Sequence, residues 1–380
     1  MKGSRFEKLL HRYDYDFPSG CIASAPASPR DSARLMVYDR KSGRVADATF
    51  RDLPKFLPRG ALLVFNDTKV IPARLTLMKP TGGLVRVLFI DLAGKCLRVL
   101  VDRPVSLGRD LLLNKKPAFR AIGREGKYLI FAPLIRGNLR NFLERNGEAP
   151  LPPYIKNTPL TKKEQRRRYQ TVFAKTPGSI AAPTASLHFT QGLLRLLKKS
   201  GVETTFVTLH VGLGTFASLT PENVKLGSLH EEEYSINGKT ADALNRAIRD
   251  GRPIIPVGTT ALRTLESAIV GGKINPVRNF KLGVRDLSNK LSQMKYSSQD
   301  DLGTISNGIK KLHGKTSLFI REGYRFRVAH GLITNFHVPR SSLLMLVSAF
   351  AGRENVLKLY QRAIKRGYRF FSFGDGMLIS

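Results

Sequence analysis

Short apolar runs that end in polar turns open the chain. The runs 34–38 and 61–65 have the length and apolar content of buried strands. The second run leads directly into Asn66, Asp67 and Thr68, within the stretch NDTKVIPARL (66–75). Polar side chains at a strand end are typical of ligand sites in α/β folds, so this triplet is a first candidate site segment.

Between residues 75 and 151 the pattern changes to closely spaced β-type runs. The runs LVRVLFI (84–90), KCLRVLV (95–101) and KYLIFAP (127–133) alternate with glycine turns. Regular spacing without a helical period predicts a small antiparallel barrel or sandwich. We therefore predict a β-barrel domain over 75–151, inserted into a larger α/β domain formed by 1–74 and 152–380.

Strands and helices alternate after residue 190. Thr190 is a suitable N-cap for a helix with three leucines on one face, and Gly201 ends that segment. The other predicted elements are strands at 202–211, 230–236, 253–257, 330–338 and 369–373, and helices at 241–251, 258–269, 341–350 and 354–367. This alternation indicates an α/β layer or barrel, so the predicted fold class is α/β with a barrel-like main domain.

Residues 273–315 interrupt the alternation. The segment is polar, basic and aperiodic, and it has no apolar face, so we predict a disordered insertion. It holds nine Lys/Arg and three Asp/Glu, which is +6 of the formal net charge of +34. The other +28 belongs to the rest of the chain, and a field of that strength attracts polyanions, with nucleic acid as the leading partner.

Composition sets further bounds. The 380 residues are 42% hydrophobic, which is enough for a sizeable core. No run approaches the ~20 apolar residues of a membrane helix, and the charged N-terminus has no apolar signal core. The two cysteines, Cys21 and Cys96, fit no zinc or disulfide framework, which agrees with a reducing compartment. We therefore expect a cytoplasmic protein without a membrane partner.

Five polar turns at strand ends carry the candidate chemistry. They are APTASLHFT (182–190) with Thr184 and His188, LHVGLGTF (209–216) with His210, GTTALRTLE (258–266) with Thr260, Arg263 and Glu266, TNFHVPRSS (334–342) with His337, and the C-terminal FGDG with Asp375. Each turn alone has a structural explanation, such as a core histidine, a β-bulge, a surface ion pair or an Asp turn. Their repetition in one α/β domain predicts that they converge on one rim.

Several site classes are disfavoured by the sequence. No two histidines have the spacing of metal ligands, so no metal is predicted. The phosphate-binding loop and the dinucleotide fingerprint are both absent. The Gly-x-Ser-x-Gly elbow of serine hydrolases is absent as well.

Ten motifs in order resemble one family, the S-adenosylmethionine:tRNA ribosyltransferase-isomerases. They are YDFP (15–18), RDSARL (30–35), NDTKVIPARL (66–75), LPPYI (151–155), YQTVFA (169–174), AAPTASLHFT (181–190), TLHVGLGTF (208–216), VGTTALRTLES (257–267), ITNFHVPRSSLLMLVSAFAG (333–352) and YRFFSFGDGMLI (368–379). The resemblance covers almost the whole chain and fails only over 273–315.

The resemblance implies a reaction and its substrates. Family members act in queuosine synthesis, where they move the ribosyl part of S-adenosylmethionine onto 7-aminomethyl-7-deazaguanine at the wobble position of tRNA. The product is epoxyqueuosine, and adenine and methionine are released. The family fold, a β-barrel inserted into an α/β barrel-like domain, agrees with the pattern above. S-adenosylmethionine is then a substrate, tRNA the partner, and we expect a monomer without a metal.

The implied chemistry assigns candidate roles. A base must remove a proton from the carbon beside the sulfonium, adenine must be helped to leave, and the aminomethyl group must be deprotonated. The candidates for these proton transfers are His188, His210, His337 and Glu266. Thr184, Thr260 and Arg263 are candidates for holding the methionine end of the substrate, and Asp67 and Asp375 for its ribose hydroxyls or sulfonium.

Two features leave questions open. Ser186 stands where family members usually have glycine, and a positive φ there would cost serine of order 1 kcal/mol. The basic segment KKEQRRRYQ (162–170) is either a contact for the tRNA backbone or a solvated charged loop, and the sequence does not separate the two. Gly376 is a milder departure, at a position where the family usually has alanine.

Two other functions remain as rivals. A non-catalytic RNA-binding protein of the same fold would keep the basic surface but lose the histidines at the strand ends. Another nucleoside-modifying transferase that uses a cofactor, with a different substrate, would keep both features.

Overall fold

The structure is a computed structural model that describes residues 5–93, 95–212, 219–270 and 311–380. The predicted insertion therefore lies outside the described residues up to position 310. Its last five residues, 311–315, belong to strand β15 (Lys311–Leu318), so the predicted insertion extends too far at its C-terminal end. In the part of the chain that is described, no helix is long and apolar enough to cross a membrane.

A five-stranded mixed sheet forms one layer of the main domain. Its order is β14 (Ile254–Pro256), β3 (Leu62–Asn66), β12 (Glu203–Leu209), β13 (Ser228–Asn237) and β15. The first three strands are parallel, and β13 and β15 are antiparallel to their neighbours. All five residues of β3 are buried, as expected for a central strand covered on both faces.

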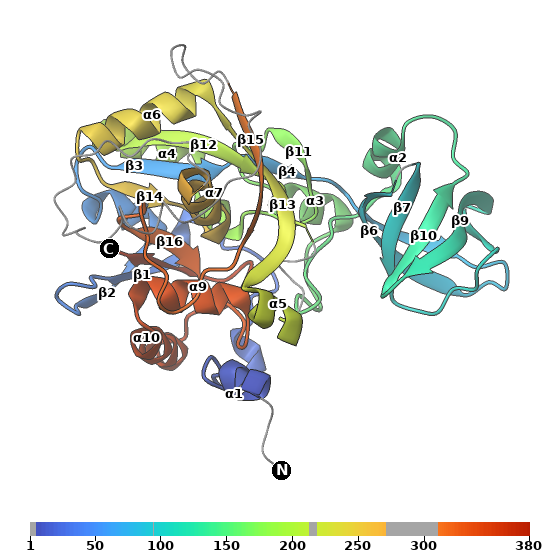
Figure 1. Ribbon diagram of the computed structural model, residues 1–380, viewed down its shortest axis with the longest axis horizontal. Coiled ribbons are helices and arrows are strands. Elements are labelled where there is room, and N and C mark those ends of the chain that lie inside the picture. The colour runs from blue at the N-terminus through green and yellow to red at the C-terminus, as the bar shows by residue number, and fades with distance from the viewer. Residues whose placement is uncertain (1–4, 94, 213–218, 271–310) are drawn as a thin grey trace, which may run out of the picture.

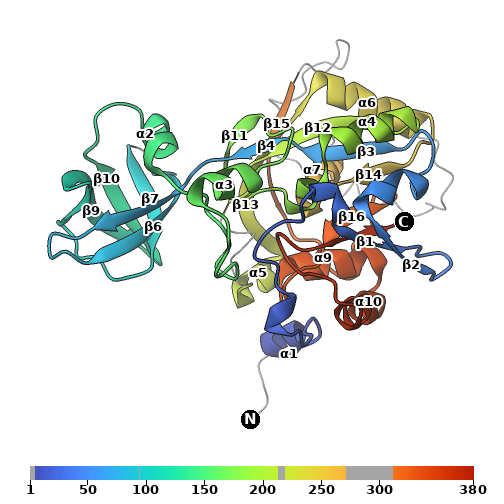
Figure 2. The ribbon, with the colours of Figure 1, turned by 180° about the vertical axis from the view of Figure 1, so that it is seen from behind.

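A second, four-stranded sheet contains both the N-terminal and the C-terminal strands. Its order is β16 (Leu332–Asn335), β17 (Gly376–Ile379), β1 (Arg34–Tyr38) and β2 (Val45–Thr49). A single β-bridge between Val257 and Ile333 connects the two sheets, so the end of β14 lies beside β16. Figures 1 and 2 show the two sheets close together in the main body of the molecule.

Helices cover these sheets where the sequence supplies apolar faces. Helix α7 (Thr259–Val270) packs against β3, β12 and β15, and it also contacts α9 (Ser342–Ala351). Helix α9 is apolar almost all round and is buried, which fits a helix enclosed by the core. Apart from α2 (Leu139–Asn146) and α3 (Lys162–Arg168), which lie between β10 (Tyr128–Pro133) and β11 (Thr176–Ser179) in sequence, the other described helices are α1 (Arg5–His11), α4 (Gln191–Lys199), α5 (Pro221–Leu226), α6 (Gly238–Arg249) and α10 (Arg353–Lys365), with 3₁₀ turns η1 (Ser19–Cys21), η2 (Arg30–Ser32), η3 (Phe50–Lys55) and η4 (Thr184–His188).

The inserted segment forms a closed barrel that projects from one side of the main body (Figure 1). Its order is β10 (Tyr128–Pro133), β7 (Cys96–Val101), β6 (Leu84–Ala93), β5 (Arg74–Met78), β8 (Asp110–Leu113) and β9 (Lys116–Glu125). Neighbouring strands are antiparallel, and alternating apolar residues fill the interior. The predicted α/β fold with an antiparallel barrel is confirmed, whereas the exact domain limits stay a prediction.

The chain leaves and re-joins the main domain at one place. Strand β4 (Thr68–Val70) leads out and β11 (Thr176–Ser179) pairs with it on return, with α2 (Leu139–Asn146) and α3 (Lys162–Arg168) between them in sequence. A Cβ added to Gly147 would lie 1.9 Å from the carbonyl oxygen of Pro72. Only glycine fits where the two chain segments touch, so this contact fixes the base of the barrel.

One predicted element is wrong at the C-terminus. The apolar run 369–373 is a turn, and the final strand is β17, three residues later. Phe371 has a left-handed backbone, with φ of 69°, which is incompatible with a strand. Residues 162–168, left as a contact or a loop by the sequence, form helix α3.

Candidate active site

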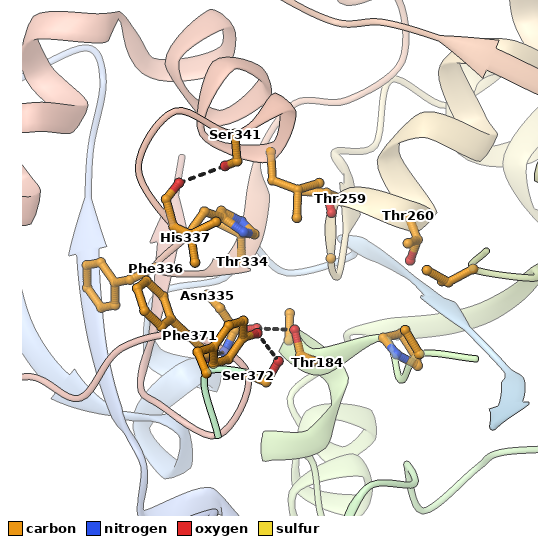
Figure 3. Close-up of a pocket in the computed structure, with 18 of the residues that line it drawn as sticks. Thr184, Thr259, Thr260, Thr334, Asn335, Phe336, His337, Ser341, Phe371 and Ser372 are labelled. Atoms are coloured by element: carbon orange, nitrogen blue, oxygen red, sulfur yellow. Dashed lines mark hydrogen bonds between the residues drawn. The ribbon is translucent and has the colours of Figure 1, made fainter. Parts of the chain in front are cut away.

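One pocket of about 320 Å³ lies where the two sheets of the main domain meet. It is lined by residues 181–185, 258–260, 334–341 and 371–372, together with Leu10, Pro153, Tyr154, Val211, Leu219 and Leu343. Three of the predicted turns therefore meet at one cavity, and Val211 belongs to a fourth. The volume lies within the usual range for small-molecule sites. Figure 3 shows His337 and Thr334 across the pocket from Thr259 and Thr260.

His337 is the one predicted histidine that lines the pocket. Its Nε2 lies 2.7 Å from the hydroxyl of Thr334, its backbone N–H donates to Tyr360 at 2.9 Å, and its carbonyl accepts from Tyr15 at 2.5 Å. Burial lowers the pKa of His337 to about 3. The ring is therefore neutral at pH 7, and it is held in place at its side chain and its backbone.

Thr184 faces the pocket through a fixed hydrogen-bond arrangement. Its hydroxyl donates to Oδ1 of Asn335 at 2.9 Å (Figure 3). The Nδ2 of Asn335 lies within 3.2 Å of the Phe371 carbonyl and within 3.4 Å of the Asp375 carbonyl. Because these acceptors hold the amide nitrogen, Oδ1 is oriented toward Thr184. Asn335 was not among the predicted site residues, although it lies in the predicted TNFHVPRSS turn.

His188 lies behind the pocket and contacts it through Asn335. Its Nε2 is 3.3 Å from Nδ2 of Asn335, so Nε2 must be the acceptor. Its ring stacks on Phe50 at 4.1 Å between centroids. Burial, followed by the charges of Arg369 and Arg30, lowers the pKa of His188 to about 3. This geometry supports a positioning role rather than direct contact with a substrate.

The two departures from the family pattern lie beside His188. A Cβ at Gly376 would come within 2.8 Å of the Phe50 ring, so glycine there allows Phe50 to stack on the histidine. Ser186 does not have a positive φ, so the backbone cost considered for serine does not arise. Its hydroxyl is fully buried and has no hydrogen-bond partner in the described part of the chain.

Two helix N-termini meet at the pocket. Thr259 and Thr260 begin helix α7, and Ser341 caps helix α9 by accepting from the backbone N–H of Leu344 at 3.2 Å. Thr260 also accepts from Nδ2 of Asn66, which links it to the end of β3. Free N–H groups and the helix dipole make such ends favourable for an anion, so this side of the pocket suits a carboxylate.

Arg263 and Glu266 share α7 with Thr260 but do not line the pocket. Arg263 forms a buried ion pair with Glu232, and its Nε donates to the Leu318 carbonyl at 3.2 Å. Glu266 accepts hydrogen bonds from Tyr324 and from the backbone amides of residues 327–329. Both side chains hold neighbouring segments to α7, and their position gives no support to roles at the substrate.

His210 and Asp67 form a separate polar cluster beside the pocket. The Nδ1 of His210 is 2.8 Å from the Thr68 hydroxyl, and Asp67 accepts from the Thr208 hydroxyl at 2.6 Å. Burial lowers the pKa of His210 and raises the pKa of Asp67 from their ordinary values. Neither residue lines the pocket, although Val211, next to His210, does.

Asp375 has a structural position as well. Its carboxylate accepts from the backbone N–H groups of Arg34 at 3.0 Å and Arg369 at 2.8 Å, and only 1% of the residue is exposed. It therefore joins the turn before β17 to the start of β1. Its carbonyl, rather than its carboxylate, reaches toward the pocket by accepting from Asn335.

Aromatic residues make up a wall that the sequence did not single out. Tyr154, Phe336 and Phe371 line the pocket. The Tyr154 hydroxyl lies 2.6 Å from that of Ser372, and burial raises its pKa to about 12. The sequence patterns that were followed are those of polar side chains: LPPYI was noted only for its family resemblance, and the C-terminal turn was noted for Asp375 rather than for its aromatic residues. The described residues contain no group of His, Cys, Asp or Glu that could hold a metal.

Comparisons with known proteins agree with one family. A family model described as "Queuosine biosynthesis protein" matches residues 10–379. Two curated relatives carry the name S-adenosylmethionine:tRNA ribosyltransferase-isomerase: one from Carboxydothermus hydrogenoformans is 41% identical, and one from Thermus thermophilus is 43% identical. Each alignment covers 97% of this chain and 99% of the relative. A crystal structure of an S-adenosylmethionine tRNA ribosyltransferase from Thermotoga maritima is similar over 97% of this chain and 100% of that chain, with 31% identity and a TM-score of 0.51.

Proposed function

Because the chain belongs to the queuosine biosynthesis protein family, we propose that it is an S-adenosylmethionine:tRNA ribosyltransferase-isomerase. It moves the ribosyl part of S-adenosylmethionine onto 7-aminomethyl-7-deazaguanine in tRNA and forms epoxyqueuosine, with release of adenine and methionine. The observation that carries this proposal is the meeting of Thr184, Thr260 and His337, from three separate turns, at one cavity.

The pocket offers complementary ends to the methionine part of S-adenosylmethionine. The carboxylate is placed at the N-termini of α7 and α9, where backbone N–H groups are available. The Thr184 hydroxyl donates its hydrogen bond to Asn335, so the lone pairs of its oxygen stay available to accept from the ammonium group. Thr260 is oriented by Asn66 and completes this end of the site. Arg263 is outside it, because its charge is paired with Glu232.

His337 is the residue we assign to proton removal beside the sulfonium. A neutral ring with Nε2–H donating to Thr334 leaves the lone pair of Nδ1 for the substrate. The low pKa keeps His337 neutral at rest at pH 7, so the ring can act as an acid toward departing adenine only after it has taken the proton from the substrate. His188 acts one step away by orienting Asn335, and His210 is not placed on the substrate.

The partner and location follow from this reaction. The tRNA that carries the deazaguanine is the nucleic acid expected from the net charge of +34, and we place the protein in the cytoplasm with its tRNA substrate. The non-catalytic alternative is not favoured, because the relatives are named as enzymes. A monomer remains a prediction.

A product assay tests the proposal. Purified protein is incubated with S-adenosylmethionine and tRNA bearing 7-aminomethyl-7-deazaguanine, and nucleosides and adenine are quantified by mass spectrometry. We expect epoxyqueuosine and adenine in equal amounts. His337→Gln should lower the rate by at least about a hundredfold, since it removes a positioned base.

The matched control is the same substitution at His11, whose side chain is 82% exposed. His11→Gln should keep the wild-type rate. Absence of both products with wild-type protein would overturn the proposed function. A normal rate for His337→Gln would leave the function standing and remove His337 as its base.

A further inference from the structure

Two residues of the pocket wall have unfavourable backbone conformations. Arg340 has φ of 56° and Phe371 has φ of 69°, a region that residues with a Cβ rarely adopt. At Asn114 and Lys115 a positive φ is what the two-residue turn between β8 and β9 requires. No such turn chemistry explains Phe371, and an aromatic residue is among the least suited to this region.

The surroundings of Phe371 impose this conformation. Its backbone N–H donates to the Phe336 carbonyl at 3.2 Å. Its own carbonyl accepts from Gly374 at 3.1 Å and from the side chain of Asn335 at 3.2 Å. Strained residues that are held on several sides in this way cluster at ligand sites, so the conformation points to a role for the ring itself.

The ring of Phe371 packs against two other aromatic rings, Tyr154, which also lines the pocket, and Phe17, which does not. Its centroid is 5.0 Å from that of Tyr154 and 5.1 Å from that of Phe17, with interplanar angles of 58° and 81°. Tyr154 is fixed by its hydrogen bond to Ser372. Figure 3 shows Phe371 and Ser372 beside Thr184. An aromatic surface and two hydroxyl groups therefore occupy the same part of the wall.

We propose that Phe371, supported by Tyr154, is the stacking wall for a purine-type ring. Planar bases stack favourably on aromatic side chains, and hydroxyl groups beside the ring are suited to hydrogen-bond the edge of a base. The proposal rests on the proposed function, in which both substrates carry such a ring: adenine in S-adenosylmethionine and deazaguanine in tRNA. A role in packing alone would be met by a residue without this backbone conflict.

Two substitutions of Phe371 test whether its aromatic face is needed, or only the volume of its side chain. Phe371→Leu keeps an apolar side chain and removes the aromatic face, whereas Phe371→Tyr keeps the face. Binding of S-adenosylmethionine is measured by calorimetry, binding of tRNA by filter retention, and KM and kcat for each substrate by the product assay. Phe371→Leu should lower the binding affinity for one of the two substrates by about 5- to 150-fold, and Phe371→Tyr should lower it by less than about threefold.

Phe370→Leu is the matched control. Phe370 is fully buried and packs in the same core, but it does not line the pocket. It should lower the melting temperature without changing either dissociation constant. If Phe371→Leu does not fold, Tyr154→Leu removes the supporting ring at a partly exposed position. This variant should lower the binding affinity for one of the two substrates.

The separate binding measurements show whether the ring that stacks on Phe371 is the adenine of S-adenosylmethionine or the deazaguanine of tRNA. Loss of S-adenosylmethionine affinity alone assigns the wall to adenine. Loss of affinity for tRNA bearing the deazaguanine, but not for tRNA with guanine at that position, assigns it to deazaguanine. Unchanged affinities for both substrates in folded, active Phe371→Leu would overturn the inference. A wild-type protein without product would instead overturn the proposed function, so the two failures are distinguishable.

Discussion

Burial sets the charge of both His188 and His337, although they face different surroundings. His337 lines the pocket, whereas His188 lies behind Asn335 against Phe50. Removal from water disfavours the imidazolium in each case and lowers the pKa from 6.5 to about 3. A neutral ring suits His188, which accepts a hydrogen bond. At His337 burial leaves the lone pair free but also makes the ring a weak base before the substrate is bound.

These pKa values predict how stability depends on pH. Below pH 6.5 the unfolded chain binds protons that the folded chain does not, so the contribution is complete above pH 6.5 and is lost as the pH falls toward 3. Each histidine should lower the free energy of unfolding by about 2 kcal/mol between pH 7 and pH 5. Urea unfolding at both pH values measures it.

The variant His188→Gln should reduce that loss by about 2 kcal/mol, because one buried group no longer titrates. Only the difference between the two pH values is compared, so any constant cost of the substitution cancels. His11→Gln, at an exposed position, serves as the reference for removing a histidine. Equal losses in His188→Gln and wild type would show that His188 is protonated in the folded state.

Helix α3 has one side that forms ion pairs with the barrel segment and another side whose cations are exposed to solvent. Its capping box, Thr161 with Glu164, explains why this very basic segment is helical rather than a loop. On one side, Lys162 pairs with Glu148 and Arg166 with Glu144, both from the segment that includes α2. The helix therefore ties the barrel segment to the main domain. Lys163 and Arg167 are exposed and form no ion pair in the described part of the chain.

Paired substitutions on α3 should separate these two tasks. Lys163→Ala with Arg167→Ala should weaken tRNA binding and reduce its salt slope by about two, with little change in stability. Lys162→Ala with Arg166→Ala removes the same charge but should mainly lower the melting temperature. Filter binding at several salt concentrations and thermal unfolding give the two readouts. Equal effects of both pairs on tRNA binding would contradict the division of the helix.

At the scale of the whole molecule, the barrel carries a share of the positive charge that is roughly in proportion to its length. Residues 75–151 contain fourteen Lys/Arg and six Asp/Glu. All six acidic side chains are in ion pairs with Arg or Lys, and the other Lys and Arg of this segment form no ion pair within the described residues. Exposed Leu84, Leu107, Ile122 and Leu134 also lie on this segment. We expect the unpaired cations to attract a polyanion such as RNA, and the barrel projects away from the main body (Figure 2).

The salt dependence of tRNA binding tests this distribution of charge. Affinity should fall by at least about a hundredfold between 50 and 200 mM salt, since each neutralised phosphate releases counterions. S-adenosylmethionine binding in the pocket should change far less and is the internal control. A tRNA affinity that is flat with salt would mean that the net charge of +34 serves solubility instead.

Hydrophobic periodicity and turn chemistry predicted most elements, and three of the five polar turns do meet at the pocket, whereas His210 and Asp375 do not line it. Thr260 and His337 could be picked out because they lie in polar turns that follow apolar strand-type runs, which end at the edge of a sheet, and Thr184 because it lies at a predicted helix start. The barrel was predictable for a similar reason, since closely spaced β-type runs with glycine turns have few other solutions. Because these signals depend only on neighbouring residues, they can be recognised from the amino-acid sequence without the tertiary structure.

Only the tertiary structure decided which polar residues face the cavity. Arg263, Glu266 and Asp375 satisfy their charges with partners that are distant in sequence, and no local pattern reports such a partner. Asn335 and Phe371 gain their importance from contacts that fix an amide and an aromatic ring. The sequence by itself determined the fold class and the motifs at the strand ends. Burial and long-range hydrogen bonding, which depend on the whole packed chain, determined the role of each residue.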